Sequence, residues 1–172
     1  MTQSVRLHTL ILTPMKVADS MSKKVVVAST LTGFPELWKK IFTHRINAIP
    51  IVDTGNRLIG IVTREDLLKI LYPTYRDLIL DFTVLPDFEE MEVSIRQLST
   101  KKAKDVMNKR VVFTRKDTQI MRALSRMIVR QVDQLPVVDE GEKVVGMITK
   151  GDIFYALAKK NFLLKTPKKG KK

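Results

Sequence analysis

The 172-residue chain has the length of one compact domain or of two small domains packed together. It contains no cysteine, which excludes disulfides and thiolate metal sites, and no apolar run reaches the roughly 18 residues of a membrane span. Because the first residues also lack the apolar stretch and cleavage site of a signal peptide, the sequence predicts a soluble cytoplasmic protein.

The net charge of +13 is spread unevenly along the chain. Residues 159–172 carry seven lysines and no acid, so about half of the net charge lies there. The last residues are too polar and too rich in glycine and proline to fold. We expect residues 161–172 to form a disordered basic tail that stays in solvent. Weak contact with nucleic acid or anionic lipid is the alternative.

The first half of the chain alternates between strand and helix patterns. A β-branched run at 25–27 predicts a short strand, and Thr32 is a candidate N-cap for the helix that follows. Two further β-branched runs, at 49–52 and 58–62, are joined by a glycine-containing turn and predict a hairpin. A second helix is expected to begin at Thr63. Apolar residues at helical spacing mark the buried face of the first helix: Phe34, Leu37, Trp38, Ile41 and Phe42.

Residues 72–101 join the two halves and hold six of the eighteen acids of the chain. They contain two amphipathic segments, which are separated at Pro86. The pattern predicts an acidic helical linker that packs against the rest of the chain or against a second copy of it. The apolar positions of the two segments are Leu78, Ile79 and Phe82, then Met91, Ile95 and Leu98.

The second half repeats the first at a constant offset of 86 residues. Between 16–71 and 102–157, 15 of 56 positions are identical, and most of the others exchange one aliphatic residue for another. Such an offset indicates a duplication, and two copies that are each marginal alone are expected to share a core. The short strand and the cap recur at 111–113 and Thr118. The expected divisions are a first repeat at 1–71, a linker at 72–101, a second repeat at 102–160 and the tail at 161–172.

Two phrases in each copy resemble a known family. Ile49-Pro50-Ile51-Val52-Asp53 and Gly60-Ile61-Val62-Thr63-x-x-Asp66, within a β-α-β-β-α order, are similar to the CBS domain, named after cystathionine β-synthase. Two such domains in tandem resemble a Bateman module. The resemblance implies an α/β (α+β) fold in which two pseudo-symmetric repeats pack sheet to sheet. It also implies clefts that take adenosine-containing ligands, and modules that pair into homodimers.

The sharpest candidate sites are Thr63 with Asp66 and, in the second copy, Thr149 with Asp152. Each pair stands where a strand ends and a helix begins, so backbone N–H groups and the helix dipole favour a phosphate there. The threonine hydroxyl can donate to phosphate, and an ionised aspartate can accept from two ribose hydroxyls. The alternative is a capping box, which contributes about 1 kcal/mol of helix stability.

The two copies differ between the threonine and the aspartate. Glu65 adds a carboxylate beside the expected phosphate, which is unfavourable, whereas Lys150 and Gly151 add none. Lys150 is itself a candidate ligand-binding residue. On this argument the cleft of Thr149 and Asp152 is expected to bind more tightly than that of Thr63 and Asp66.

The resemblance implies further ligand contacts on the strands and at the ends of the first helices. For the strand residues the alternative is an ordinary core position, and for the cations it is a favourable place at a helix C-terminus. The candidates for contacts with a base are Val26 and Val112, then Ile46, Ala48 and Pro50, with Val132, Gln134 and Pro136; the phosphate candidates are His44, Arg45 and Arg130.

The sequence shows no catalytic motif, and its two histidines, His8 and His44, lie far apart with no cysteine to complete a metal site. The expected function is therefore that of a non-enzymatic regulatory module with no required cofactor. It would bind AMP, ADP, ATP or S-adenosylmethionine as a regulatory ligand and act on an effector protein in trans. The alternatives are a structural dimerisation module with empty clefts and a weak nucleic-acid binder. Nucleic acid is the less expected partner, because no stacking platform of aromatic residues is visible.

Overall fold

The computed structural model describes residues 15–71 and 88–162. In the first repeat, strand β1 (Ala28–Ser29) leads into helix α1 (Phe34–His44), followed by β2 (Ala48–Val52), β3 (Leu58–Thr63) and helix α2 (Arg64–Leu71). This is the β-α-β-β-α order expected from the sequence. The predicted acidic linker contains helix α4 (Phe88–Leu98). The linker positions Leu78, Ile79 and Phe82 and residues 163–172 of the predicted basic tail lie outside the described residues. Residues 161 and 162, which the sequence assigned to the tail, instead belong to a helix that ends at Phe162.

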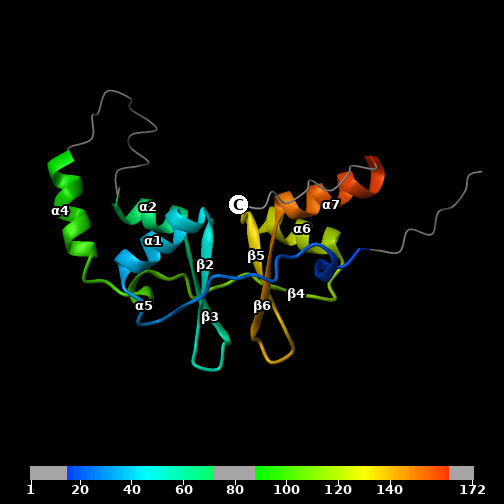
Figure 1. Ribbon diagram of the computed structural model, residues 1–172, viewed down its shortest axis with the longest axis horizontal. Coiled ribbons are helices and arrows are strands. Elements are labelled where there is room, and N and C mark those ends of the chain that lie inside the picture. Colours follow the sequence, from blue (N-terminus) through cyan, green and yellow to red (C-terminus); the bar gives the residue numbers. More distant parts are fainter. Residues whose placement is uncertain (1–14, 72–87, 163–172) are drawn as a thin grey trace, which may run out of the picture.

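The second repeat has the same elements in the same order. Strand β4 (Thr114–Arg115) leads into α6 (Ile120–Val129), then β5 (Gln134–Val138), β6 (Val144–Thr149) and α7 (Lys150–Phe162). Each repeat forms its own three-stranded sheet, in which the first strand is parallel to the second and the third is antiparallel to it. The two hairpins lie side by side in the middle of the molecule, with α1 and α2 on one side and α6 and α7 on the other (Figure 1).

Two local predictions were wrong. The first strand of each repeat lies at 28–29 and 114–115, one position beyond the β-branched runs at 25–27 and 111–113. The N-caps of α1 and α6 are Gly33 and Gln119, not the threonines that precede them, and neither makes a side-chain capping bond. Thr32 instead accepts a hydrogen bond from the Ser29 N–H at 3.0 Å, so its hydroxyl closes the turn before the helix.

The turns between the hairpin strands are held by aspartate, as the sequence predicts. Asp53 accepts hydrogen bonds from the N–H groups of Gly55 and Arg57, and the Arg57 guanidinium lies 2.8 Å from it. The bonds from Arg57 are the main reason why the pKa of Asp53 lies below its usual value. In both turns the residue with a left-handed backbone is the one after the glycine. It is Asn56, at φ 63°, in the first turn and Glu142, at φ 61°, in the second.

The segment that precedes each repeat packs onto the other repeat. A short 3-10 helix, η1 (Val17–Asp19), places its valine in the core of the second repeat, and α5 (Ala103–Val106) places its alanine in the core of the first. Both crossing segments are visible in Figure 1, where the chain runs from one half of the molecule to the other. Asp19 caps its segment by accepting from the Lys16 N–H at 2.8 Å, and Asp105 does the same from Lys102 at 2.9 Å. The two repeats are therefore interlocked.

Glycines in the third strands allow the crossing segments to approach closely. A Cβ on Gly146 would lie 2.8 Å from the Met21 sulfur and 3.0 Å from the Ser22 carbonyl oxygen, and one on Gly60 would lie 2.5 Å from the Met107 sulfur. Ser22 and Met147 also exchange backbone hydrogen bonds of 2.8 and 2.9 Å across this contact. The identity of Gly60 and Gly146 between the copies thus has a packing cause.

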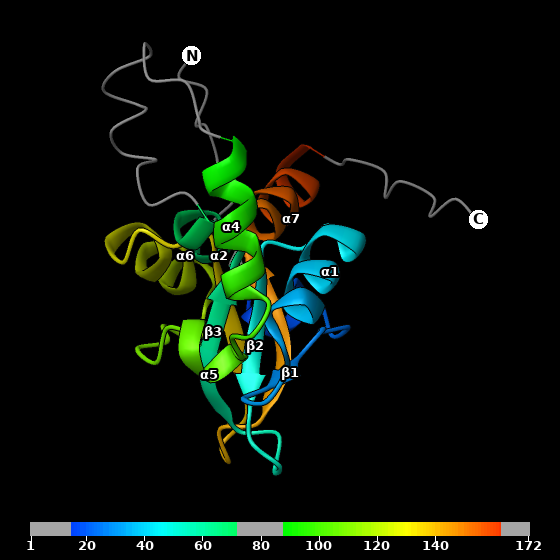
Figure 2. The ribbon, with the colours of Figure 1, turned by 90° about the vertical axis from the view of Figure 1, so that its left-hand side faces the viewer.

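The hairpin tips hold the two sheets together at their far ends. Leu58 N–H donates to the Glu142 carbonyl and Val144 N–H to the Asn56 carbonyl, both at 3.0 Å. Figure 2 shows the two tips extending in the same direction, away from the helices, and α4 standing beside α2. Within the described ranges no helix is long and apolar enough to cross a membrane.

Candidate ligand-binding cleft

The strand–helix junctions of both repeats form capping boxes. Asp66 accepts from the Thr63 N–H at 2.9 Å and from its hydroxyl at 2.7 Å, while the Asp66 N–H donates to the Thr63 hydroxyl oxygen at 3.0 Å. Thr149 and Asp152 make the same three bonds at 2.8, 2.8 and 3.0 Å. Both hydrogen bonds that the Asp66 carboxylate accepts use one oxygen, Oδ2. The other oxygen, Oδ1, makes no hydrogen bond to a described residue. The capping role does not exclude a ligand.

A cavity of about 400 Å³ opens between the repeats at the first of these junctions. Its walls come from three parts of the chain. The first repeat provides the end of β3 and the start of α2, the crossing segment after α5 provides residues 108–112, and the second repeat provides the link from α6 to β5. The lining residues are Asn47, Ile61, Thr63, Arg64, Glu65, Asp66, Asn108, Arg110, Val111, Val112, Arg130, Gln131, Val132, Asp133 and Gln134.

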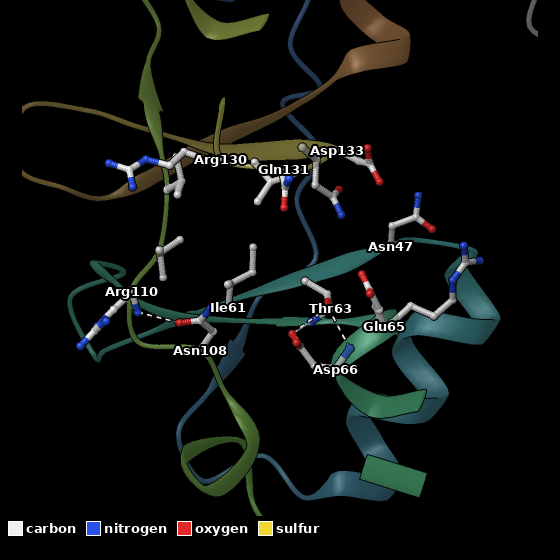
Figure 3. A pocket seen from close by; sticks show the side chains of 15 residues that line it. Asn47, Ile61, Thr63, Glu65, Asp66, Asn108, Arg110, Arg130, Gln131 and Asp133 are labelled. Carbon is white, nitrogen blue, oxygen red and sulfur yellow. Dashed lines mark hydrogen bonds between the residues drawn. The ribbon is translucent and has the colours of Figure 1, made fainter. Parts of the chain in front are cut away.

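The cavity lining carries three arginines and the three carboxylates of Glu65, Asp66 and Asp133. Figure 3 shows Arg110 and Arg130 on one side of the cavity, with the carboxylates toward the other. The third arginine, Arg64, directly precedes Glu65 in the chain. The cavity therefore offers two cations at one end and hydrogen-bond acceptors at the other, a pattern suited to a polar ligand.

Between the charged ends the cavity wall is apolar. Ile61 lies in the middle of the cavity in Figure 3, and Val111, Val112 and Val132 also line it. Val112 and Val132 are partly buried and pack against the core of the second repeat, so the wall is fixed by the fold. An apolar surface flanked by polar groups is the usual composition of a small-molecule site.

The structure brings six of the residues predicted from the sequence into this one cavity. They come from both copies rather than from one: Thr63, Asp66, Val112, Arg130, Val132 and Gln134. The remaining candidates lie outside it: Val26, His44, Arg45, Ile46, Ala48, Pro50, Pro136, Thr149, Lys150 and Asp152. Among these, Pro50 and Pro136 are buried in β2 and β5.

The surroundings of the second junction are different. The Lys150 ammonium lies 2.8 Å from an Asp133 carboxylate oxygen, so this candidate ligand-binding residue is already paired. Asp152 lines a separate cavity with Met15, Asp19 and Tyr155.

Sequence reasoning missed several lining residues. Asn108 and Arg110 belong to the crossing segment, where the Asn108 side chain accepts from the Arg110 N–H at 2.8 Å. Asn108 also exchanges backbone hydrogen bonds with Ile61 of the first repeat. No motif marks these positions, and only the exchange of segments between repeats brings them to the cleft. Gln131 and Asp133 follow Arg130 directly, and their proximity to that candidate was the available signal.

Two pseudo-symmetric repeats, interlocked and with a cleft beside a Thr-x-x-Asp junction, define a CBS pair. The model of the CBS domain family matches residues 17–73 and 103–159. The chain belongs to the CBS domain family.

Relatives of similar length share this architecture. The chain is 28% identical over 156 residues to protein MJ1426 of Methanocaldococcus jannaschii. The aligned region covers 83% of this chain and 91% of that protein. The CBS domain pair of protein MJ0100, solved with 5'-methylthioadenosine and S-adenosyl-L-methionine, matches with a TM-score of 0.66 and 24% identity, over 86% of this chain and 99% of that one.

A plant CBS pair is also similar. CBSX2 from Arabidopsis thaliana matches with a TM-score of 0.71 and 21% identity, over 87% of this chain and 99% of that one. A structure of CBSX2 in complex with AMP matches with a TM-score of 0.65 and 23% identity, over 84% of this chain and 96% of that one. At these identities the likeness to solved structures shows the fold.

Proposed function

We propose that this protein is a non-enzymatic regulatory module that binds an adenosine-containing ligand in the cleft between its repeats. The observation that carries the proposal is the cavity that joins Thr63 and Asp66 of one repeat to the apolar wall of the other. The complexes of MJ0100 with S-adenosyl-L-methionine and of CBSX2 with AMP support the choice of ligand class.

Each part of the cleft has a matching part in such a ligand. Oδ1 of Asp66, which makes no hydrogen bond to a described residue, can accept from the ribose hydroxyls while Oδ2 keeps the helix cap. The purine packs against Val112 and Val132, where the wall is apolar. A phosphate or carboxylate is attracted by the arginines that line the cleft, among them the predicted phosphate candidate Arg130.

The balance of charge bears on which ligand fits. Glu65 and Asp133 place two carboxylates in the lining, and the lysines that pair with them at 2.8 Å, Lys69 and Lys150, lie outside it. A ligand phosphate that extends toward these carboxylates is therefore repelled by them. We therefore favour AMP or S-adenosylmethionine over ATP. The tighter binding expected from the sequence at Thr149 and Asp152 stays a prediction. The pairing of Lys150 with Asp133 and the presence of Arg64 beside Glu65 are arguments against it.

The position of the cleft supplies a means of regulation. A ligand that contacts both repeats stabilises the arrangement of the repeats to which it binds best, at the expense of the others. An effector protein in trans that distinguishes these arrangements would then respond to the ligand. This role requires no cofactor and no catalytic group.

A thermal-shift screen with AMP, ADP, ATP and S-adenosylmethionine tests the proposal. AMP or S-adenosylmethionine should raise the melting temperature more than ATP does, for the electrostatic reason given above. If no adenosine compound shifts the melt at millimolar concentration, the clefts are empty and the protein is a structural module instead.

We also propose that the protein is a homodimer. The apolar stripes of the first helices extend beyond the core, because Phe42 is 41% exposed and Ile128 is 61% exposed. The neighbouring Val129 is 78% exposed, and the Phe42 ring contacts Trp38 in a tilted arrangement with a ring-centroid distance of 4.4 Å. Apolar surface of this kind marks an interaction site, and the resemblance to CBS pairs makes a second copy the expected partner.

Light scattering coupled to size exclusion should give about twice the chain mass of 19.7 kDa at micromolar concentration. Ile128→Asp should yield the monomer, because a carboxylate in the interface would be desolvated without a partner. Leu31→Asp, in the turn before α1 at a residue 65% exposed, is the matched control and should leave the dimer intact. The second repeat has an aspartate, Asp117, at the corresponding position, so the change is compatible with the fold. A wild-type monomer would refute the proposal.

A further inference from the structure

A second cavity lies on the second repeat, away from the cleft. It has a volume of about 650 Å³ and lies between the region around β4 and one face of α6. It shares no lining residue with the cleft described above. Three of its seven lining residues are arginines. The full lining is Phe113, Arg115, Asp117, Thr118, Gln119, Arg122 and Arg126.

Two of these arginines are held in place by backbone carbonyls. Arg115 Nη1 donates to the Asp139 carbonyl at 2.9 Å, and Arg126 Nη1 donates to the Phe113 carbonyl at 2.5 Å. Both side chains are half-buried, which limits their freedom. Because a guanidinium carries five N–H donors, each retains donors for a further acceptor.

The positive charge of this cavity is not neutralised by the protein. The ion pairs among residues 15–71 and 88–162 include none of the three arginines. Asp117 is the one carboxylate among the lining residues, so the lining carries a net positive charge. Three positive charges around one cavity repel one another, and a bound anion would relieve this repulsion.

The first repeat shows that the fold does not need these arginines. At the offset of 86 residues, Ser29 stands in place of Arg115, and Glu36 and Lys40 stand in place of Arg122 and Arg126. There the helix positions form an internal ion pair, with the Lys40 nitrogen 3.3 Å from a Glu36 oxygen. The duplicated structure therefore has a neutral version and a basic version of the same surface.

We propose that this arginine cavity binds a compact anion with more than one phosphate group, of the kind represented by pyrophosphate. Guanidinium groups match phosphate oxygens with paired hydrogen bonds, and two of the three are already oriented by their carbonyl contacts. A concave site suits a compact anion better than the convex backbone of a nucleic-acid duplex. This site goes beyond the cleft and does not depend on the adenosine ligand.

Calorimetric titration of the full chain with pyrophosphate at low ionic strength tests the proposal. The wild type should show saturable binding. Arg122→Glu, which installs the residue found in the first repeat, should weaken the affinity by about tenfold or more, because a charged hydrogen-bond donor is lost. Arg122 makes none of the structural contacts of its neighbours, and Arg122→Gln provides a milder variant that should weaken binding less.

Lys39→Glu is the matched control, because it makes the same change of charge at an exposed position of α1. It should leave the affinity within about twofold, since exposed charges at a distance are screened. If Arg122→Glu and Lys39→Glu weaken the affinity for pyrophosphate equally, the general surface charge explains the binding and the proposal is overturned. Loss of binding in Arg130→Gln but not in Arg122→Glu would place the anion in the cleft. Arg122-dependent binding of a short DNA duplex without binding of pyrophosphate would assign the surface to nucleic acid.

Discussion

Gly146→Ala should lower the free energy of unfolding by about 1–3 kcal/mol, the usual cost of overpacking a filled site. The new methyl group would lie 2.8 Å from the Met21 sulfur and 3.0 Å from the Ser22 carbonyl oxygen. The sulfur can move, but the carbonyl belongs to backbone that is hydrogen-bonded to Met147 on the same strand. The crossing segment must therefore shift, and with it the contact between the repeats. Urea unfolding followed by circular dichroism measures the change.

Gly141→Ala in the turn of the same hairpin is the control. Its nearest neighbour would be an Asp139 carboxylate oxygen at 3.5 Å, an ordinary contact distance. Because alanine also restricts the unfolded chain, this variant should be as stable as the wild type or slightly more stable. If both variants unfold at the same urea concentration, the close approach of the crossing segment is not a constraint on the fold.

Asp66→Asn should remove most of the stabilisation that AMP gives to the protein. At a hundredfold excess over its Kd, a ligand that binds the folded state alone stabilises it by about 2.7 kcal/mol. A hundredfold weaker Kd would leave roughly 0.4 kcal/mol under the same conditions. Asparagine keeps an oxygen for the Thr63 N–H and so preserves the cap, whereas it loses the charge that accepts from the ribose. Thermal unfolding with and without AMP separates the two effects.

Asp152→Asn makes the identical change in the other capping box. It should retain most of the AMP-induced shift if the cleft at Thr63 is the main site. If only Asp152→Asn loses the AMP-induced shift, AMP binds mainly at Thr149 and Asp152. That result would support the sequence argument that Glu65 repels a phosphate at the first junction. Retention of the shift in both variants would separate ligand binding from these junctions.

The repeat made most of the fold predictable. A constant offset across 56 positions let each element be checked against its copy, and the hairpins and second helices lie where the pattern put them. The first strand of each repeat was predicted at the wrong position, because the runs at 25–27 and 111–113 have the composition of a strand. Pairing with β2 and β5 begins only at Ala28 and Thr114. Tertiary pairing, not local propensity, sets those boundaries.

The site was predictable residue by residue but not as an assembly. Thr63 and Asp66 were found because a strand–helix junction has recognisable chemistry. Val112, Arg130, Val132 and Gln134 were also candidates, but nothing in the sequence predicted that they would join Thr63 and Asp66 in one cavity. Asn108 and Arg110 were not assigned, because the exchange of crossing segments has no local signature in the sequence. That exchange brings Arg110 of the second repeat to the junction of the first. The charges of Glu65 and Arg130 could be read from the sequence, whereas the place of Arg110 in the cleft could not.

The most direct test of the central claim is a titration of the nitrogen-15-labelled protein with AMP, followed by amide chemical shifts. The account predicts saturable shifts that cluster at Thr63, Asp66, Val112 and Val132, which line the cleft from both repeats. Amides of the arginine cavity around Arg122 should stay unchanged at the same concentrations. Shifts confined to residues outside the cleft, or no saturable shift at millimolar AMP, would contradict the account.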